Sequence, residues 1–203
     1  MRRGILRGVF AFCTLCTAVA TTVIGERTAQ AQLHWDAGVE AALDKRFLTN
    51  RAAGQGDAGF GPAFRLSGHL ALLPLIRVGG YLGYALSPQD DVLRHMTTGG
   101  LEARIFPPFG FTKLRPFALL GFGYQRTFTS AASGGCFETP LGIGTSYRVR
   151  KPFEIGALLT SRIGFACGGD LYRATSITGA SGPTATGQDR FGLSLGLFAA
   201  LEL

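Results

Sequence analysis

The sequence has few charged residues and no long apolar run after its first 24 residues. Only 16% of the residues are charged and no lysine-rich run is present, so we expect no nucleic-acid partner. The longest later apolar stretch, residues 70–76, is seven residues long and contains Pro74. A transmembrane helix needs ~20 apolar residues. If the later part of the chain crosses a membrane, it must therefore cross with strands.

The sequence also lacks the motifs of common catalytic and cofactor sites. It contains no phosphate-binding glycine loop, no nucleophile elbow and no metal-ligand spacing. The histidines after residue 31 are His34, His69 and His95, and none has a serine at a recognisable catalytic spacing. We therefore predict structural or solvated histidines, no enzymatic activity, no cofactor and no metal.

The N-terminus has the three parts of a secretory signal peptide. These are the positive Arg2, Arg3 and Arg7, the apolar or small residues 9–24, and the small-x-small sequence Ala29-Gln30-Ala31. We predict a cleaved signal peptide at residues 1–31 and one mature domain at residues 32–203. Four arginines and one glutamate leave with the signal peptide, so the net charge falls from +7 to +4. A retained anchor is the alternative, but the apolar stretch is short for spanning a bilayer.

The main feature of the mature region is an alternation of apolar and polar side chains with a period of two, the pattern of a β-strand. In the first segment Val39 and Leu43 share one face, and Glu40 and Asp44 share the other. The pattern recurs in eight segments, at residues 34–47, 60–72, 76–86, 100–106, 117–128, 141–150, 153–167 and 191–203. An even number of strands suits a closed antiparallel barrel, and closure leaves no unpaired backbone edge in lipid.

The connections between these segments are predicted to alternate in length. Long polar loops are expected at residues 49–59, 87–98, 129–140 and 168–190, and tighter turns near residue 74, at 107–116 and at 151–152. Aromatic residues lie near both ends of the segments on the apolar face, as in an interfacial girdle. Short turns at one end and long loops at the other are typical of outer-membrane barrels, whose short turns face the periplasm.

On these patterns the mature region resembles the small, porin-like bacterial outer-membrane β-barrels of the OmpA and OmpX type. The resemblance implies an all-β fold, a single antiparallel transmembrane up-and-down barrel of about eight strands, in the outer membrane of a Gram-negative bacterium. It also implies contact with outer-membrane lipid, assembly by the barrel-assembly machinery, and a monomer. Proteins of this type usually end in an aromatic residue that the machinery reads, whereas Leu203 ends this chain.

Two cysteines stay in the mature region, Cys136 and Cys167, in an oxidising compartment. They flank the predicted hairpin at equal distances from its turn at residues 151–152, so both are expected at the same height on the loop side. Strict alternation would place them on opposite faces, but we expect Pro140 and the loop to break the register. The sequence therefore predicts a structural disulfide that ties the third long loop to the fourth.

The polar faces of the predicted strands carry many charges that would point into the barrel. The predicted interior charges are Glu40, Asp44, Arg46, Arg65, Arg77, Glu102, Arg104, Arg148, Glu154, Arg162 and Glu202, with His69 beside them. One interpretation is a conducting lumen that prefers anions. The other, which we favour, is a paired network that fills the barrel, because eight strands enclose a space that side chains can fill and charges removed from water must pair.

The sequence-based hypothesis for function is an integral outer-membrane barrel with a structural or interaction role, together with weak passage of small solutes. One alternative is a lipid-modifying enzyme on the same scaffold. Another is an exported soluble barrel that binds an apolar ligand inside, like a lipocalin. The last requires an apolar interior and a charged exterior, the reverse of the predicted pattern.

Overall fold

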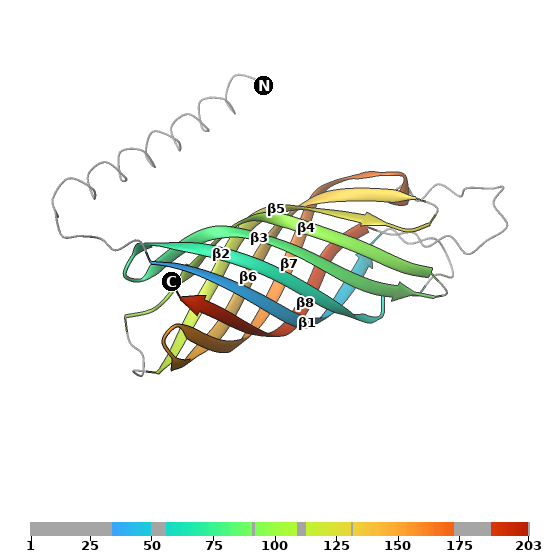
Figure 1. Cartoon of the computed structure of the whole chain (residues 1–203). Coiled ribbons are helices and arrows are strands. Elements are labelled where there is room, and N and C mark those ends of the chain that lie inside the picture. Colours follow the sequence, from blue (N-terminus) through green and yellow to red (C-terminus); the bar gives the residue numbers. More distant parts are fainter. Residues whose placement is uncertain are drawn as a thin grey trace, which may run out of the picture. The chain divides into compact units, whose positions relative to one another are not determined.

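The computed structural model describes residues 34–49, 56–90, 92–108, 113–130, 132–172 and 188–202. In these ranges eight antiparallel strands close into a barrel in chain order, because β1 pairs with both β2 and β8 (Figure 1). The strands are β1 (Trp35–Thr49), β2 (Phe60–Leu73), β3 (Ile76–Gln89), β4 (Val92–Ile105), β5 (Leu114–Phe128), β6 (Ser133–Arg150), β7 (Phe153–Gly169) and β8 (Gln188–Glu202). A short 3-10 helix, η1 (Asp170–Tyr172), follows β7. The predicted all-β up-and-down barrel is confirmed.

The predicted signal peptide and Leu203 lie outside the described residues. Within the described ranges, no helix has the length and apolar character needed to cross a membrane. The barrel has a turn end and a loop end. The turn end holds the β2–β3 and β6–β7 turns and the pair Asp36–Glu202. The loop end holds the last residues of β1 and β7, the first residues of β2 and β8, and η1.

The two faces of the sheet have opposite polarity. Every strand exposes large apolar side chains on the outer face, for example Leu43, Phe64, Leu82, Leu101, Phe122, Ile143, Phe153 and Leu197. Leu82 and Leu197 are 68% and 71% exposed, whereas Asp44 and Glu138 inside the barrel are 0% exposed. A soluble protein buries its apolar face and exposes its charges. This barrel does the reverse, as outer-membrane barrels do.

A small apolar cluster occupies the interior toward the turn end. It contains Phe106, Phe117, Leu119, Leu158, Phe198 and Ala200. The ring of Phe117 lies 5.6 Å from that of Phe106 and 5.9 Å from that of Phe198, measured between centroids. The guanidinium of Arg104 stands over Phe117 and Phe198 at 5.3 and 5.4 Å. These cation–π contacts stabilise the Arg104 guanidinium inside the lumen.

Two of the predicted long loops are mostly strand, so this part of the prediction is wrong. β3 and β4 stay paired up to Gln89 and Val92, which places most of residues 87–98 in a hairpin. β6 begins at Ser133, so residues 133–140 also belong to a strand. These strand ends carry more polar residues on both faces than the middle of the strands does. The apolar alternation that identifies a strand is therefore weaker there.

Candidate functional site

Every charged residue predicted to point inward does face the lumen. The side chains of Arg148 and Glu202, at the turn end, are 29% and 19% exposed, and the other predicted interior charges are at most 8% exposed as residues. The lumen is therefore the largest polar site in the described part of the chain. The arrangement of the charged side chains in the lumen decides whether the barrel is a channel or a filled scaffold.

At the turn end, carboxylates alternate with arginines from neighbouring strands. Arg77 donates to Asp36 at 2.8 Å and to Glu202 at 2.9 Å. Arg148 donates to Glu202 at 2.7 Å and reaches Glu154 at 3.4 Å. These contacts tie β1, β3, β6, β7 and β8 together near the chain ends. The charged pairs partly offset the cost of removing each ion from water.

Farther into the barrel, His69 lies between two carboxylates. Its Nδ1 is 2.8 Å from Asp36 and its Nε2 is 2.7 Å from Glu102. Arg65 forms ion pairs with Glu40, at 3.6 Å, and with Glu102. A neutral imidazole donates only one hydrogen bond, so the Asp36–His69–Glu102 group needs one additional proton, on the ring or on a carboxyl, to make both bonds. The group acts as a continuous hydrogen-bonded bridge between β1, β2 and β4.

At the loop end the network centres on Asp189. Its carboxylate accepts hydrogen bonds from Arg94 at 2.8 Å, from Thr127 at 2.7 Å and from the hydroxyl of Tyr172 at 3.0 Å. Arg46 donates to Asp44 at 2.7 Å on the same strand and to Gln125 across the lumen at 3.0 Å. These contacts link strands on opposite sides of the barrel.

The helix η1 packs against the loop end of the lumen. Leu171 and Tyr172 are 1% and 4% exposed and belong to an apolar cluster with Cys136. Burial, reinforced by the negative charge of Asp189, raises the pKa of the Tyr172 hydroxyl above its ordinary value. The hydroxyl therefore stays a hydrogen-bond donor to Asp189 at neutral pH.

Cys136 and Cys167 form a disulfide between β6 and β7. The predicted cause of the register break is wrong, because Pro140 stays in register and pairs with Arg162. The shift falls between Gly135 and Phe137 on β6, opposite a β7 segment in which Ala166 has φ = 50°. This irregularity turns Cys167 toward Cys136.

Some interior charges escaped the sequence-based list. These are Asp36, Arg94, Arg115, Glu138 and Asp189. Arg94 and Glu138 fell in segments predicted to be loops, and Asp189 preceded the predicted start of the last strand. One sequence signal could have placed Arg94 inside the barrel. Residues 94, 96 and 98 continue the alternation along β4, and all three are buried.

With these additions the described lumen is balanced in charge. It holds eight arginines, namely 46, 65, 77, 94, 104, 115, 148 and 162, and eight carboxylates, namely 36, 40, 44, 102, 138, 154, 189 and 202. An anion-selective pore needs an excess of positive charge along its wall. Equal numbers of both signs instead suit a closed network of ion pairs.

Inward-facing glycines make room for this network. A Cβ at Gly123 would lie 2.3 Å from the hydroxyl of Tyr81, and one at Gly192 would lie 2.8 Å from Arg46. Neighbouring side chains thus occupy the space that these glycines leave. A cavity beside Arg65 and Arg162 has a volume of about 10 Å³, room for one water molecule at most.

The contacts of His69 and His95 in the described ranges are with carboxylates and with aromatic side chains. The Nδ1 atom of His95 lies 2.6 Å from the Tyr84 hydroxyl, in hydrogen-bond contact, and the ring stacks on Phe128 at the loop end. His69 lies inside the barrel between carboxylates. No group of three or more His, Cys, Asp or Glu side chains that could hold a metal occurs among the residues with described positions.

No protein-family model and no curated protein matches the sequence. Among solved structures, the barrel is similar to Neisserial surface protein A (NspA), at a TM-score of 0.62 and 12% identity over 83% of this chain and 97% of that one. It is also similar to Ail, the attachment invasion locus protein of Yersinia pestis, at 0.53 and 11% over 84% and 99%. A major outer membrane protein from Thermus thermophilus matches at 0.50 and 14% over 83% and 99%. The fold is therefore that of the small eight-stranded outer-membrane barrels, as the sequence pattern predicted.

Proposed function

We propose that the chain is an integral outer-membrane β-barrel with a structural or interaction role, whose lumen is a packed scaffold closed to solutes. The observation that carries this proposal is the inverted polarity of the barrel. Apolar side chains cover the outside of all eight strands, while sixteen ionisable side chains, eight arginines and eight carboxylic acids, point inward. An apolar belt of this extent is stable in contact with lipid and promotes aggregation in water.

The scaffold role follows from how the interior is filled. Charges of both signs balance, and η1 packs over the loop end. An interior filled by paired charges in this way makes the barrel a rigid scaffold. In this proposal the turn end faces the periplasm, the loop end faces outward, and residues 1–31 are removed during export. The barrel contacts outer-membrane lipid, depends on the barrel-assembly machinery and works as a monomer.

The two alternative functions receive less support. A lipocalin-like binder needs an apolar interior, whereas this interior is lined with arginines and carboxylates. A lipid-modifying enzyme needs a nucleophile, a histidine and an acid at the lipid-facing rim. His95 is near that rim, and its described contacts are Tyr84 and Phe128.

Membrane contact can be tested with a matched pair of substitutions on the outer face. Leu82 lies in the middle of β3 and Leu72 lies near the end of β2, with exposed fractions of 68% and 64%. In lipid, Leu82→Lys should lower the free energy of unfolding by about 2–4 kcal/mol and Leu72→Lys by about 0–1 kcal/mol. In a soluble barrel both substitutions would be nearly neutral. Equal, small effects, or recovery of the protein in the soluble fraction without detergent, would rule out the membrane location.

The closed lumen can be tested separately by conductance in planar bilayers. The purified barrel should fold in detergent with heat-modifiable gel mobility and give no steady current after insertion. Steady channels would overturn the scaffold role and support solute passage, while the membrane location would stand.

A further inference from the structure

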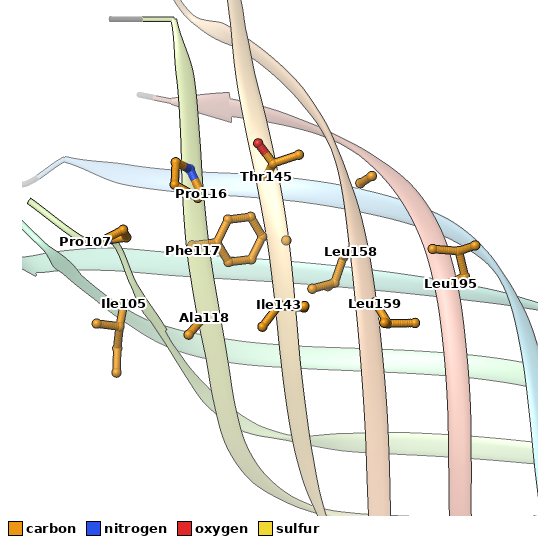
Figure 2. Close-up of a pocket in the computed structure, with 12 residues that line it drawn as sticks. Ile105, Pro107, Pro116, Phe117, Ala118, Ile143, Thr145, Leu158, Leu159 and Leu195 are labelled. Atoms are coloured by element: carbon orange, nitrogen blue, oxygen red, sulfur yellow. The ribbon is translucent and has the colours of Figure 1, made fainter. Parts of the chain in front are cut away.

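A trough crosses the outer face of β6 and β7 in the half of the barrel near the turn end (Figure 2). Its floor consists of small side chains, Thr145 and Ala157, which lie opposite each other in the β6–β7 pair. Gly144 lies beside them, and Phe117 from the lumen packs so closely behind it that a Cβ there would lie 2.5 Å from the ring. The outer surface of the barrel is therefore depressed at this point, because no large side chain projects from it.

Taller side chains border the trough on both sides. Ile143 and Leu159 pair on the side toward the middle of the barrel, and Tyr147 and Ile155 pair on the side toward the turn end. The part toward Ile105 has a volume of about 660 Å³. An adjoining part that also touches Thr145 extends toward Leu197 and has a volume of about 720 Å³. Both volumes are in the range of ligand-binding clefts, and apolar side chains dominate both linings.

The surface beside the trough at the turn end carries only positive charge among the described residues. Lys113 directly precedes Leu114, which lines the second part of the trough, and the Lys113 carbonyl accepts a hydrogen bond from the Arg148 N–H at 2.9 Å. Arg150 ends β6 and Lys151 follows it, and all three cations are exposed. The nearest carboxylates, Glu154 and Glu202, point inward and pair with arginines of the lumen. The exposed cations are thus available to bind an anion from outside the protein.

We infer that this site binds one phospholipid with an anionic headgroup, with an acyl chain in the trough and its phosphate near Lys113 and Arg150. The inference rests on the proposed membrane location. A groove lined by hydrocarbon matches an acyl chain, and cations at the end of the groove match a phosphate at the membrane interface. The occupant belongs to the leaflet that surrounds the turn end.

The inference can be tested with spin-labelled lipids on the full mature barrel in phosphatidylcholine vesicles. The measurement is the motionally restricted fraction of phosphatidylglycerol, compared with phosphatidylcholine, both labelled on the acyl chain. We expect phosphatidylglycerol to be favoured. Lys113→Gln combined with Arg150→Gln should remove the preference, and each cation should account for roughly five-fold or less in relative association.

The trough itself is tested by Ala157→Leu, which raises its floor. Ala103→Leu is the matched control, because Ala103 faces outward on β4 between Val78 and Leu120 and does not line either part of the trough. Ala157→Leu should reduce the restricted fraction of phosphatidylglycerol, and Ala103→Leu should leave it unchanged. Heat-modifiable gel mobility checks that each variant is folded.

Three outcomes would overturn the inference while leaving the membrane location intact. They are an inserted wild-type barrel without headgroup preference, a preference that survives loss of both cations, and equal effects of the two alanine substitutions. Failure of the wild-type barrel to insert into vesicles would instead overturn the proposed function on which the inference rests.

Discussion

The guanidinium of Arg94 on β4 lies 2.8 Å from the carboxylate of Asp189 on β8, so one ion pair crosses the lumen at the loop end. The two residues are 95 positions apart in the chain and are 1% and 2% exposed. The same oxygen of Asp189 accepts hydrogen bonds from Thr127 and Tyr172. Asp189 therefore joins β4, β5, β8 and η1.

Replacing Asp189 should be among the most damaging changes in the lumen. Asp189→Asn keeps the side-chain size but removes the charge that faces Arg94. Loss of one partner of a buried pair costs about 3–5 kcal/mol. Urea unfolding in vesicles, followed by the fluorescence of the single tryptophan, Trp35, measures the change. The control is Asp90→Asn in the exposed β3–β4 turn, where we expect less than about 0.5 kcal/mol. Equal losses would contradict the central role of Asp189.

The hydroxyl of Tyr172 should contribute modestly at neutral pH. Tyr172→Phe removes the hydrogen bond to Asp189 and the polar contact with the Thr127 hydroxyl, while keeping the ring that packs near Cys136. A loss of about 1 kcal/mol is expected in the same urea experiment. A gain in stability would show that burying the hydroxyl costs more free energy than its hydrogen bonding contributes.

The raised pKa of Tyr172 predicts a loss of stability at alkaline pH. Below about pH 10, the ordinary tyrosine pKa, the hydroxyl is protonated in both the folded and the unfolded chain. Above it, the unfolded chain releases this proton while the folded barrel keeps it, so unfolding is favoured as pH rises. Wild type should lose about 1.4 kcal/mol per pH unit relative to Tyr172→Phe in that range. Parallel pH profiles of the two proteins would refute this.

The disulfide should stabilise the barrel against unfolding by closing a loop in the unfolded chain. Cys136 and Cys167 are separated by 31 positions, and a loop of this length corresponds to about 3–4 kcal/mol. The double variant Cys136→Ser, Cys167→Ser should unfold at lower urea than oxidised wild type. Reduced wild type serves as the control and should behave like the double variant. Equal midpoints before and after reduction would exclude a stabilising bond.

Two arginines near the middle of the lumen should respond differently to the same substitution. Arg65 pairs with Glu40 and Glu102, so Arg65→Met leaves two buried carboxylates without it and should cost about 3–5 kcal/mol. Arg162 is 5% exposed, forms none of the ion pairs in the described ranges, and its Nε has no partner there. Arg162→Met should change stability by less than about 1 kcal/mol or increase it. A large loss at Arg162 would reveal a stabilising role that its described contacts do not explain.

The alternation pattern identifies a strand only where the outer face of that strand is apolar. Along the middle of the strands, the outer face carries apolar residues such as Leu82 and Leu101, so the pattern identifies both the strand and its faces. Around Gln89 and Arg94 the strands continue with more polar faces. For this reason the extended β3–β4 hairpin and the interior place of Arg94 were not predicted.

The sequence by itself determined the number of strands, the chain order of the barrel and the interior position of eleven charged residues. All three depend on a period of two within one strand, which is a local property. Only the tertiary structure decided which charges meet, that η1 packs over the lumen, and that an irregularity near Ala166 brings Cys167 to Cys136. These relationships depend on the stagger between strands and on closure of β8 against β1, which bring together residues as distant as Arg94 and Asp189.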